Sequence, residues 1–428
     1  MTFPGASIQK ELSDFEVSIE ANRCLYCYDA PCIRACPTHI DIPAFIAKIA
    51  DGNIKGSART ILEANPMGAS CARVCPVSEL CEGACVYNTE SDTPIRIGDL
   101  QRYATDHVRD RGIALFEAGT PTGKRVAVVG GGPAGLSVAR DLRRYGHAVT
   151  IFEAHEQLGG LNTYGIVPFR LATDVALWEA QQVLDLGCEV RTGVRVGEDV
   201  GARSLVDEFD AIVLACGMGG VPRLGIPGEE HVWDALAFIE RAKMTGGAPG
   251  LGNRVAVIGA GNTAIDALTC AKRLGAQRVT MYYRRGEAQM TAYDFEYDFA
   301  KEEGIEFRFF CSPTRVIVEG GQVTGLELSR TSLEDGHLTR VAGSEFVEAC
   351  DTVISAIGQS RLLATIDALG VAHDGGVVRV DDEMRTSRKG IFAAGDAIFE
   401  KGAREAMVVE AAQQGKIAAR SVNEFLYG

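Results

Sequence analysis

The sequence lacks the long apolar runs that membrane segments need, and it lacks any dense cluster of positive charge. No run of about 18 apolar residues occurs in the 428 residues, so we expect no membrane span. The first 20 residues carry five charged side chains and no apolar core, which argues against a secretory signal. Lys and Arg number 43 against 57 Asp and Glu, a net charge of −14, so we expect no nucleic-acid partner.

Cysteine, by contrast, is abundant, with 13 residues in a chain that shows no export signal. Such a chain is expected in a reducing, cytoplasmic compartment, where thiolates serve metals rather than disulfides. The length predicts roughly three domains, and the 49 glycines suit the tight turns of nucleotide-binding α/β folds. Five scattered cysteines are interpreted as small buried hydrophobic residues: Cys188, Cys216, Cys270, Cys311 and Cys350.

The other eight cysteines form two runs between residues 24 and 85. The first run is Cys24, Cys27, Cys32 and Cys36, and the second is Cys71, Cys75, Cys81 and Cys85. Cys36 and Cys75 each precede a proline, which is typical of ferredoxin-like runs whose last cysteine ligates the other cluster. Zinc is the alternative, but paired Cys-x-x-Cys knuckles are absent, since only one such pair occurs. The spacing therefore favours iron–sulfur clusters.

The flanking sequence of residues 1–120 is expected to be helical. Apolar spacing predicts helices over 43–50, with Asp41 as N-cap, over 56–64, and over 97–108, which would carry Gln101. The cysteine runs would lie on loops between these helices. Residues 118–124 are predicted to form a linker.

After the linker the pattern changes to a buried strand, a glycine-rich turn and a helix. The turn is Gly-x-Gly-x-x-Gly, and an acidic residue ends the next strand 23 positions after its first glycine. This complete context predicts a dinucleotide site, with the pyrophosphate at the helix N-terminus and the acid on the ribose. The candidate residues are Gly130, Gly132, Pro133, Ala134, Gly135 and Glu153.

The same unit occurs a second time, with Gly259, Gly261, Asn262 and Thr263 at its turn. No acid ends the second strand here; Arg284 and Arg285 follow instead. Arginine at this place can pair with a ribose 2′-phosphate, which favours NADPH, although two solvated arginines are the plainer alternative.

Two further strands, ending near Gly217 and Gly358, and a strand that ends on Gly395 and Asp396 complete the pattern. The predicted fold class is α/β, with an N-terminal helical domain followed by two nested Rossmann-like domains. The predicted domains are 1–120, helical and iron–sulfur; 121–235, the first part of an FAD domain; 236–355, an inserted NAD(P)H domain; and 356–428, the second part of the FAD domain.

These motifs together, with the Gly159–Gly165 stretch, resemble the glutamate synthase small-subunit group of flavoproteins over essentially the whole chain. The resemblance implies FAD at the first turn, with Gly160, Gly395 and Asp396 beside it, and NAD(P)H at the second. It also implies two 4Fe–4S clusters in the N-terminal domain.

Two details are similar to dihydropyrimidine dehydrogenase, namely the five residues between Cys75 and Cys81 and the segment Ile97–Gln101, in which glutamine replaces a thiolate. The resemblance implies two ligand sets, with Cys71 in neither: Cys24, Cys27, Cys32 and Cys85 for one cluster, and Cys36, Cys75, Cys81 and Gln101 for the other. The plainer alternative for Gln101 is a helix-surface residue.

The implied function is an electron-input subunit that oxidises NAD(P)H through FAD and passes single electrons to a partner. The implied partner is an FMN and iron–sulfur catalytic subunit of dihydropyrimidine dehydrogenase, in a hetero-oligomer such as a heterotetramer, that reduces uracil or thymine. No side chain is expected to act as acid or base. The two-subunit relatives are regarded as NADH users, so the expectation is NAD(P)H without a choice.

Three alternatives follow from the same residues. The chain could serve as the small subunit of glutamate synthase or as a ferredoxin–NAD(P) oxidoreductase. A disulfide reductase needs a cysteine pair near the flavin, and no cysteine follows Gly160 until Cys188. A non-catalytic redox sensor would not need the complete nicotinamide site.

Overall fold

The computed structural model describes residues 11–90, 93–400 and 406–427, and these form two compact units. Among the described residues, the larger unit comprises 11–163, 170–218 and 361–427, and the smaller comprises 164–169 and 219–360. The two segments of the smaller unit thus separate three segments of the larger one in the sequence. This division reflects the packing within each unit. It does not test the domain boundaries at 120, 235 and 355, which stay predictions.

The larger unit begins with helices and short turns, and its described residues before β1 (Arg125–Val129) contain no strand. Asp41 caps the helix over 42–50 as predicted, because its side chain accepts a hydrogen bond from the Ala44 backbone N–H. The helices predicted over 56–64 and 97–108 are also present, each with slightly wider bounds. The helices are α1 (Asp14–Arg23), α2 (Pro31–Ala35), α3 (Ile42–Ala50), α4 (Ile54–Ala64), α5 (Gly68–Val74), α6 (Tyr87–Glu90) and α7 (Ile97–Asp110).

A five-stranded sheet forms the rest of the larger unit, with the order β16-β4-β1-β2-β3 and every pair parallel. Its strands after β1 are β2 (Ala148–Phe152), β3 (Glu189–Arg191), β4 (Ala211–Leu214) and β16 (Ile391–Ala393). Its helices are α8 (Pro133–Arg144), α9 (Leu161–Tyr164), α10 (Thr173–Leu184), α11 (Ala202–Glu208), α15 (Leu363–Leu369) and α16 (Val408–Tyr427), and a short hairpin pairs β14 (His373–Asp374) with β15 (Val377–Val378).

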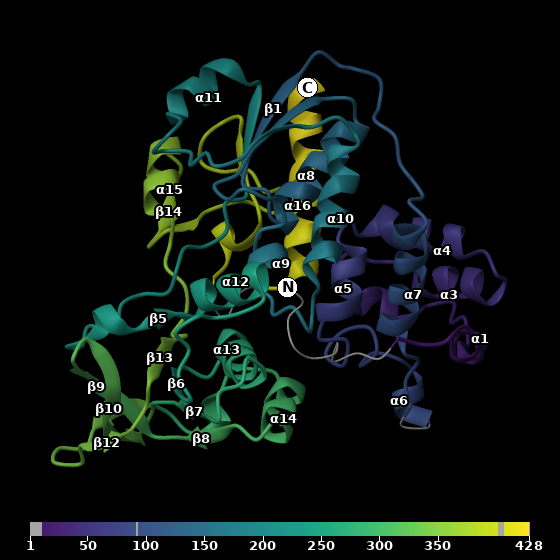
Figure 1. The fold of residues 1–428 in the computed structure, drawn as a ribbon. Coiled ribbons are helices and arrows are strands. Elements are labelled where there is room, and N and C mark those ends of the chain that lie inside the picture. The colour runs from purple at the N-terminus through teal and green to yellow at the C-terminus, as the bar shows by residue number, and fades with distance from the viewer. Residues whose placement is uncertain (1–10, 91–92, 401–405, 428) are drawn as a thin grey trace. The chain divides into compact units, whose positions relative to one another are not determined.

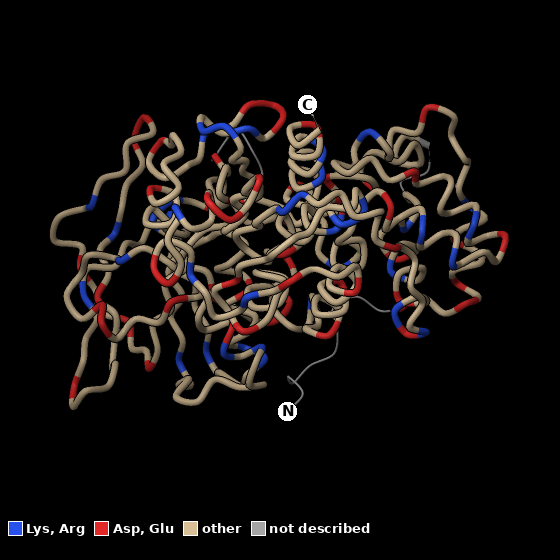
Figure 2. The backbone as a smooth tube through the Cα atoms, turned by 90° about the horizontal axis from the view of Figure 1, so that it is seen from above, with Lys and Arg blue, Asp and Glu red and all other residues tan. Residues whose placement is uncertain are grey.

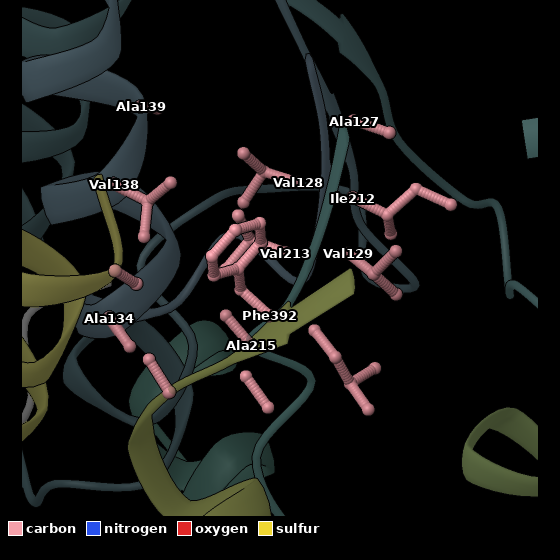
Figure 3. Close-up of a cluster of buried hydrophobic side chains, with 14 of the residues drawn as sticks. Ala127, Val128, Val129, Ala134, Val138, Ala139, Ile212, Val213, Ala215 and Phe392 are labelled. Carbon is pink, nitrogen blue, oxygen red and sulfur yellow. The ribbon is translucent and has the colours of Figure 1, made fainter. Parts of the chain in front are cut away.

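The core of this sheet places the start of α8. Val128, Val213 and Phe392 come from three neighbouring strands and pack beneath Ala134 and Val138 of α8 (Figure 3). Such side chains contribute roughly 1.5–3 kcal/mol each when fully buried. The final helix α16 packs along α8 (Figure 1). A Cβ on Gly415 would lie 2.4 Å from the Ala134 carbonyl oxygen, so this helix crossing is close enough to require glycine.

The smaller unit repeats the parallel plan, with the sheet order β5-β13-β6-β7-β8. It comprises β5 (Trp233–Asp234), α12 (Ala235–Thr245), β6 (Arg254–Ile258), α13 (Asn262–Arg273), β7 (Arg278–Tyr282), α14 (Asp294–Glu302), β8 (Glu306–Arg308) and β13 (Thr352–Ser355). An antiparallel sheet that no motif predicted joins β9 (Cys311–Glu319), β10 (Gln322–Glu334), β11 (His337–Arg340) and β12 (Phe346–Glu348). The predicted fold class, helices followed by two Rossmann-like sheets, is confirmed.

Charged residues of both signs occur throughout the described chain. Figure 2 shows Lys and Arg interspersed with Asp and Glu along the backbone. No helix in the ranges that the structure describes is long and apolar enough to span a bilayer.

Candidate functional site

Four cysteines of the larger unit line one apolar cavity. Cys24, Cys27, Cys32 and Cys85 share its wall with side chains that include Ile42, Ile46 and Tyr87. Burial, together with the neighbouring Cys24 and Cys85 thiols, raises the pKa of the Cys32 thiol to about 11. Cys85 thus leaves its neighbours in the second run and joins three cysteines of the first, which is the exchange that the ferredoxin pattern predicts.

A second group gathers Cys36 with three cysteines of the later run. The Cys75 pKa is raised well above its ordinary value by a hydrogen bond with Cys71, by burial, and by the nearby Cys71, Cys81 and Cys36 thiols. Cys36 and Cys71 are buried. Cys71, which neither predicted ligand set includes, therefore lies within this group.

Both groups can be tested against zinc and against an iron–sulfur cluster. Within the described ranges, no three His, Cys, Asp or Glu side chains converge as the ligands of a single metal ion do. Zinc needs four ligand atoms at about 2.0–2.3 Å from one point. A cluster distributes its irons, so thiols spread around the wall of an apolar cavity fit it better.

Gln101 lies on α7 and bonds to α5, the helix that carries Cys71 and ends at Cys75. It is buried, and its side-chain Nε2 donates to the Gly68 carbonyl oxygen at the start of α5 (2.7 Å). A carboxylate holds the start of α7 itself: Glu82 accepts from the Gly98 backbone N–H at 2.9 Å, and burial raises the pKa of Glu82 to about 7. The plain helix-surface alternative for Gln101 does not describe this buried amide.

The first glycine turn runs from β1 into α8, and its three glycines have different surroundings. Gly130 has a φ of +107°, and a Cβ there would lie 2.3 Å from the Ala215 carbonyl oxygen. A Cβ on Gly135 would lie 1.9 Å from the Gly130 carbonyl oxygen. A Cβ on Gly132, by contrast, would have only the Gly160 Cα within 4 Å, at 3.7 Å. Gly132 therefore leaves room at the N-terminus of α8, where a pyrophosphate fits.

Glu153 ends β2 and turns its carboxylate back to this turn. Its Oε2 accepts from the Gly131 N–H at 2.8 Å, and its Oε1 accepts from the His155 N–H at 2.8 Å. Burial would raise the pKa of Glu153, but hydrogen bonds from His155 and Gly131 outweigh it and lower that pKa. The side chain is thus fixed as an anion, and His155 is a neighbour that no motif indicated.

Residues far along the chain complete the first site. A Cβ on Gly395 would lie 2.8 Å from the Ala134 Cβ, which brings the Gly395–Asp396 segment against the start of α8. Arg361 holds this segment by donating to the Asp396 carbonyl oxygen at 3.0 Å. Burial raises the pKa of the Asp396 carboxyl, and the Arg361 charge opposes the rise. The predicted residues around Gly132, Gly160 and Gly395 therefore lie together.

The second turn, in the smaller unit, has the same construction. Gly259 has a φ of +136°, and a Cβ there would lie 2.3 Å from the Ala356 carbonyl oxygen. Asn262 begins α13 and accepts from the Tyr293 N–H through its Oδ1 at 3.1 Å. The backbone N–H of Thr291 bonds to the Ala260 carbonyl at 3.1 Å, so residues 291–293 border the turn. The sequence motifs did not indicate this bordering segment.

The two arginines follow β7, directly after the position that the acid occupies in the first site. Phe152 pairs with Val129 in one sheet as Tyr282 pairs with Ile258 in the other, so Tyr283 corresponds to Glu153. Arg284 is exposed and Arg285 is partly exposed. Neither guanidinium makes an ion pair with a carboxylate in the part of the chain that the structure describes. Both charges are therefore available to an anion.

Two family models match the chain. Residues 5–113 match dihydropyrimidine dehydrogenase domain II, 4Fe-4S cluster. Residues 124–415 match pyridine nucleotide-disulphide oxidoreductase.

Several curated proteins are similar over almost the whole chain. The NAD-dependent dihydropyrimidine dehydrogenase subunit PreT of Salmonella typhimurium is 34% identical, with 95% of this chain and 94% of that protein covered. The small chain of Escherichia coli glutamate synthase [NADPH] is also 34% identical, covering 98% and 93%. The NADP(+)-dependent formate dehydrogenase subunit beta of Moorella thermoacetica is 36% identical over 93% of this chain, which spans only 60% of that protein.

Solved structures show the same fold over part of the chain at lower identity. Thioredoxin reductase of T. acidophilum superposes with a TM-score of 0.58 at 21% identity, covering 71% of this chain and 98% of that one. FprA of Mycobacterium tuberculosis in complex with NADPH gives a TM-score of 0.58 at 18% identity, covering 71% and 85%.

Proposed function

This chain belongs to the flavoprotein family of the glutamate synthase small chains and the dihydropyrimidine dehydrogenase PreT subunits, and we propose that it delivers electrons to a pyrimidine-reducing partner. It is an NAD(P)-dependent oxidoreductase subunit that uses FAD and 4Fe–4S clusters. When bound, these cofactors convert the two electrons of a hydride into single electrons. The partner in the proposal is an FMN and iron–sulfur catalytic subunit that reduces uracil or thymine, in a hetero-oligomer.

The residues proposed to hold FAD come from both parts of the larger unit. The space beside Gly132 supports a pyrophosphate there, because the N–H groups at the start of α8 point to it. Glu153 is anionic and anchored, which suits a ribose hydroxyl donor. The full proposed set is Gly130, Gly132, Pro133, Ala134, Gly135, Glu153, Gly160, Gly395 and Asp396.

The residues proposed to hold NAD(P)H lie in the smaller unit. Gly259, Gly261, Asn262 and Thr263 form the turn at the N-terminus of α13. A Cβ on Gly261 would lie 3.2 Å from the Thr291 Oγ1, so the narrow turn suits glycine. Arg284 and Arg285, free of carboxylate partners in the described chain, are proposed to bind a 2′-phosphate.

The cluster ligands are proposed in two sets. The wall of the apolar cavity supports Cys24, Cys27, Cys32 and Cys85 as the first set. The nearby Cys36 and Cys81 thiols, which raise the pKa of Cys75, support the second set, which Gln101 completes. Cys71, whose thiol lies beside Cys75, is in neither proposed set.

The observation that carries the pyrimidine assignment is the buried Gln101 amide. Its Nε2 is committed to the Gly68 carbonyl at 2.7 Å, which leaves Oε1 for iron. A neutral oxygen ligand makes a cluster less negative than four thiolates do, so it raises the reduction potential, other factors being equal.

The role of a glutamate synthase small chain is the second candidate function. The Escherichia coli small chain matches 98% of this chain at 34% identity, the same identity as the PreT subunit. The same electron-input residues would then serve a glutamate-forming partner. The two candidates share the proposed FAD and NAD(P)H residues, and they differ in the partner and in whether Gln101 is a cluster ligand.

The test is co-purification of the full chain from its natural source, followed by assay of the pair. NAD(P)H oxidation that depends on uracil or thymine supports the pyrimidine assignment. Oxidation that depends on glutamine and 2-oxoglutarate instead transfers the assignment to glutamate synthase. The chain alone with an artificial electron acceptor is the control; if it fails to oxidise NAD(P)H while yellow-brown, the electron-input role is wrong.

A further inference from the structure

One carboxylate of the sheet region is buried against the helical region instead of facing its own sheet. Glu179 lies on α10 and is 2% exposed. Its Oε1 accepts from the backbone N–H of Ala69 at 2.7 Å and of Ser70 at 3.0 Å. The Ser70 hydroxyl donates to its Oε2. Both oxygens are therefore used within the first turn of α5.

This contact supplies what α5 does not supply itself. The residue before α5, Met67, offers no side-chain acceptor to the first N–H groups of the helix. Such N–H groups are costly when buried without a partner, typically ~1–3 kcal/mol each. Glu179 satisfies two of them from a position more than a hundred residues later in the chain.

The helix that Glu179 holds carries two cysteines of the second group. Cys71 follows Ser70 directly, and Cys75 is the C-cap of α5. At 1.5 Å per residue, Cys75 lies roughly 7–8 Å along the axis from Ser70. Gln101 of α7 reaches the same helix through the Gly68 carbonyl. A shift at the start of α5 would therefore move both Cys75 and the partner of Gln101.

The chain just before α5 is held from the sheet region as well. Arg140 of α8 donates to the Glu63 carbonyl at 3.2 Å and also to the Leu62 carbonyl. Lys416 of α16 donates to the Ala64 carbonyl. These cations satisfy the last carbonyls of α4, whereas Glu179 acts on α5 itself.

We propose that Glu179 is a positioning residue of the second iron–sulfur site, which it serves by fixing the start of α5 and by placing a negative charge near Cys75. The proposal rests on the proposed ligand set of that site. Removing the charge stabilises the reduced, more negative cluster and so raises its reduction potential.

The pKa of Glu179 decides the pH at which the measurement is made. Burial raises the pKa of Glu179 to about 7, while the Ser70 and Ala69 hydrogen bonds and the charge of Arg73 oppose the rise. Arg73 is itself paired with Asp106 of α7 at 2.7 Å. At about pH 8.5 the carboxyl is ionised, so its charge is present in the unmodified chain.

Two variants of the full chain separate charge from position. Glu179→Gln retains an acceptor for the N–H groups and removes the charge. Glu179→Asp retains the charge and shortens the side chain by one methylene, which withdraws the acceptor from Ala69 and Ser70. Glu198→Gln, which removes an exposed charge of the same unit, is the matched control; the Glu198 side chain is 61% exposed.

The measurements are an EPR redox titration of both clusters and amide hydrogen exchange at Ala69 and Ser70. For Glu179→Gln we expect a roughly tenfold shift toward the reduced form of one cluster, equal to about 59 mV for one electron, and an unchanged second cluster. For Glu179→Asp we expect at least tenfold faster exchange at both amides. Glu198→Gln should match the unmodified chain in both measurements.

The charge role is overturned if Glu179→Gln changes both cluster equilibria by less than twofold. The positioning role is overturned if Glu179→Asp exchanges at the rate of the unmodified chain. A failure of the ligand set is distinguishable, because Cys75→Ser would then leave both EPR signals intact, while the exchange test needs no bound cluster.

Discussion

The Gln101 side chain and the Gly68 backbone are joined by a hydrogen bond of 2.7 Å between Nε2 and the carbonyl oxygen. A carbonyl only accepts, so this bond fixes which end of the amide faces away from α5. The end that this bond leaves unused is Oε1, the atom that can bind iron. The hydrogen bond to this one backbone carbonyl thus orients the Gln101 amide, whereas a surface glutamine would have no such fixed orientation.

Replacement of Gln101 tests this orientation. Gln101→Ala should alter the EPR spectrum of one cluster and leave the other unchanged. Gln101→Glu adds a negative charge and should lower the potential of the same cluster, by about 59 mV for a tenfold change in equilibrium. Cys71→Ser is the matched variant. If it changes the spectrum and Gln101→Ala does not, Cys71 is the fourth ligand.

The exchange of cysteines between the two runs predicts a pattern of non-additivity. Cys85→Ser should reduce iron from about eight to about four per chain, because it opens one four-iron cluster. Adding Cys32→Ser should cause little further loss, since both residues line the same cavity. Adding Cys75→Ser should remove the remaining iron. Iron and sulfide analysis measures this, and equal losses from both double variants would contradict the two sets.

The paired arginines predict coenzyme preference. Arg284→Ala with Arg285→Ala should raise the KM for NADPH roughly tenfold or more, since hydrogen bonds to charged groups contribute about 1.5–3 kcal/mol. The KM for NADH, which has no 2′-phosphate, should change less than twofold. Arg223→Ala, whose side chain is 91% exposed in the same unit, is the control. Equal effects on both coenzymes would show that the arginines are solvated surface residues that do not bind a 2′-phosphate.

Local pattern was sufficient to predict the two parallel sheets and their turns. The turn at Gly130 and the turn at Gly259 both need positive φ and close backbone approach, and such demands leave glycine at fixed spacing. The antiparallel sheet of β9–β12 was missed, although Gly320 and Gly321 between β9 and β10 are a hairpin signal. The irregular register of that pair, with a shift between Val323 and Gly325, weakens the alternation that reveals strands.

Residues that act across the fold could not be found from local pattern. Glu179 caps a helix more than a hundred positions earlier, and Arg361 holds the backbone of Asp396. His155 lies two residues from Glu153, yet only the folded turn shows that its N–H shares that carboxylate with Gly131. The motif residues are proposed to bind cofactors at fixed spacing, whereas no fixed spacing constrains these long-range partners.

The Glu153 carboxylate predicts a dependence on pH. Its pKa is lowered in the fold because the His155 and Gly131 hydrogen bonds outweigh burial. The stabilisation is therefore present above the ordinary carboxyl pKa of about 4.3, and it is lost as pH falls through the lower folded value. Glu153→Gln should lower the Tm of the cofactor-free chain at neutral pH, by an amount that shrinks below about pH 4.

Thermal unfolding across pH, followed by circular dichroism, measures the effect. Glu189→Gln on the adjacent strand is the control, since its side chain is 57% exposed and its surface pair with Arg191 contributes little. Glu153→Gln should also weaken FAD binding roughly tenfold at neutral pH, because an amide accepts a ribose hydroxyl less strongly than a carboxylate. A Tm difference that stays constant from neutral to acidic pH would show that shape, and not the anion, is what Glu153 provides.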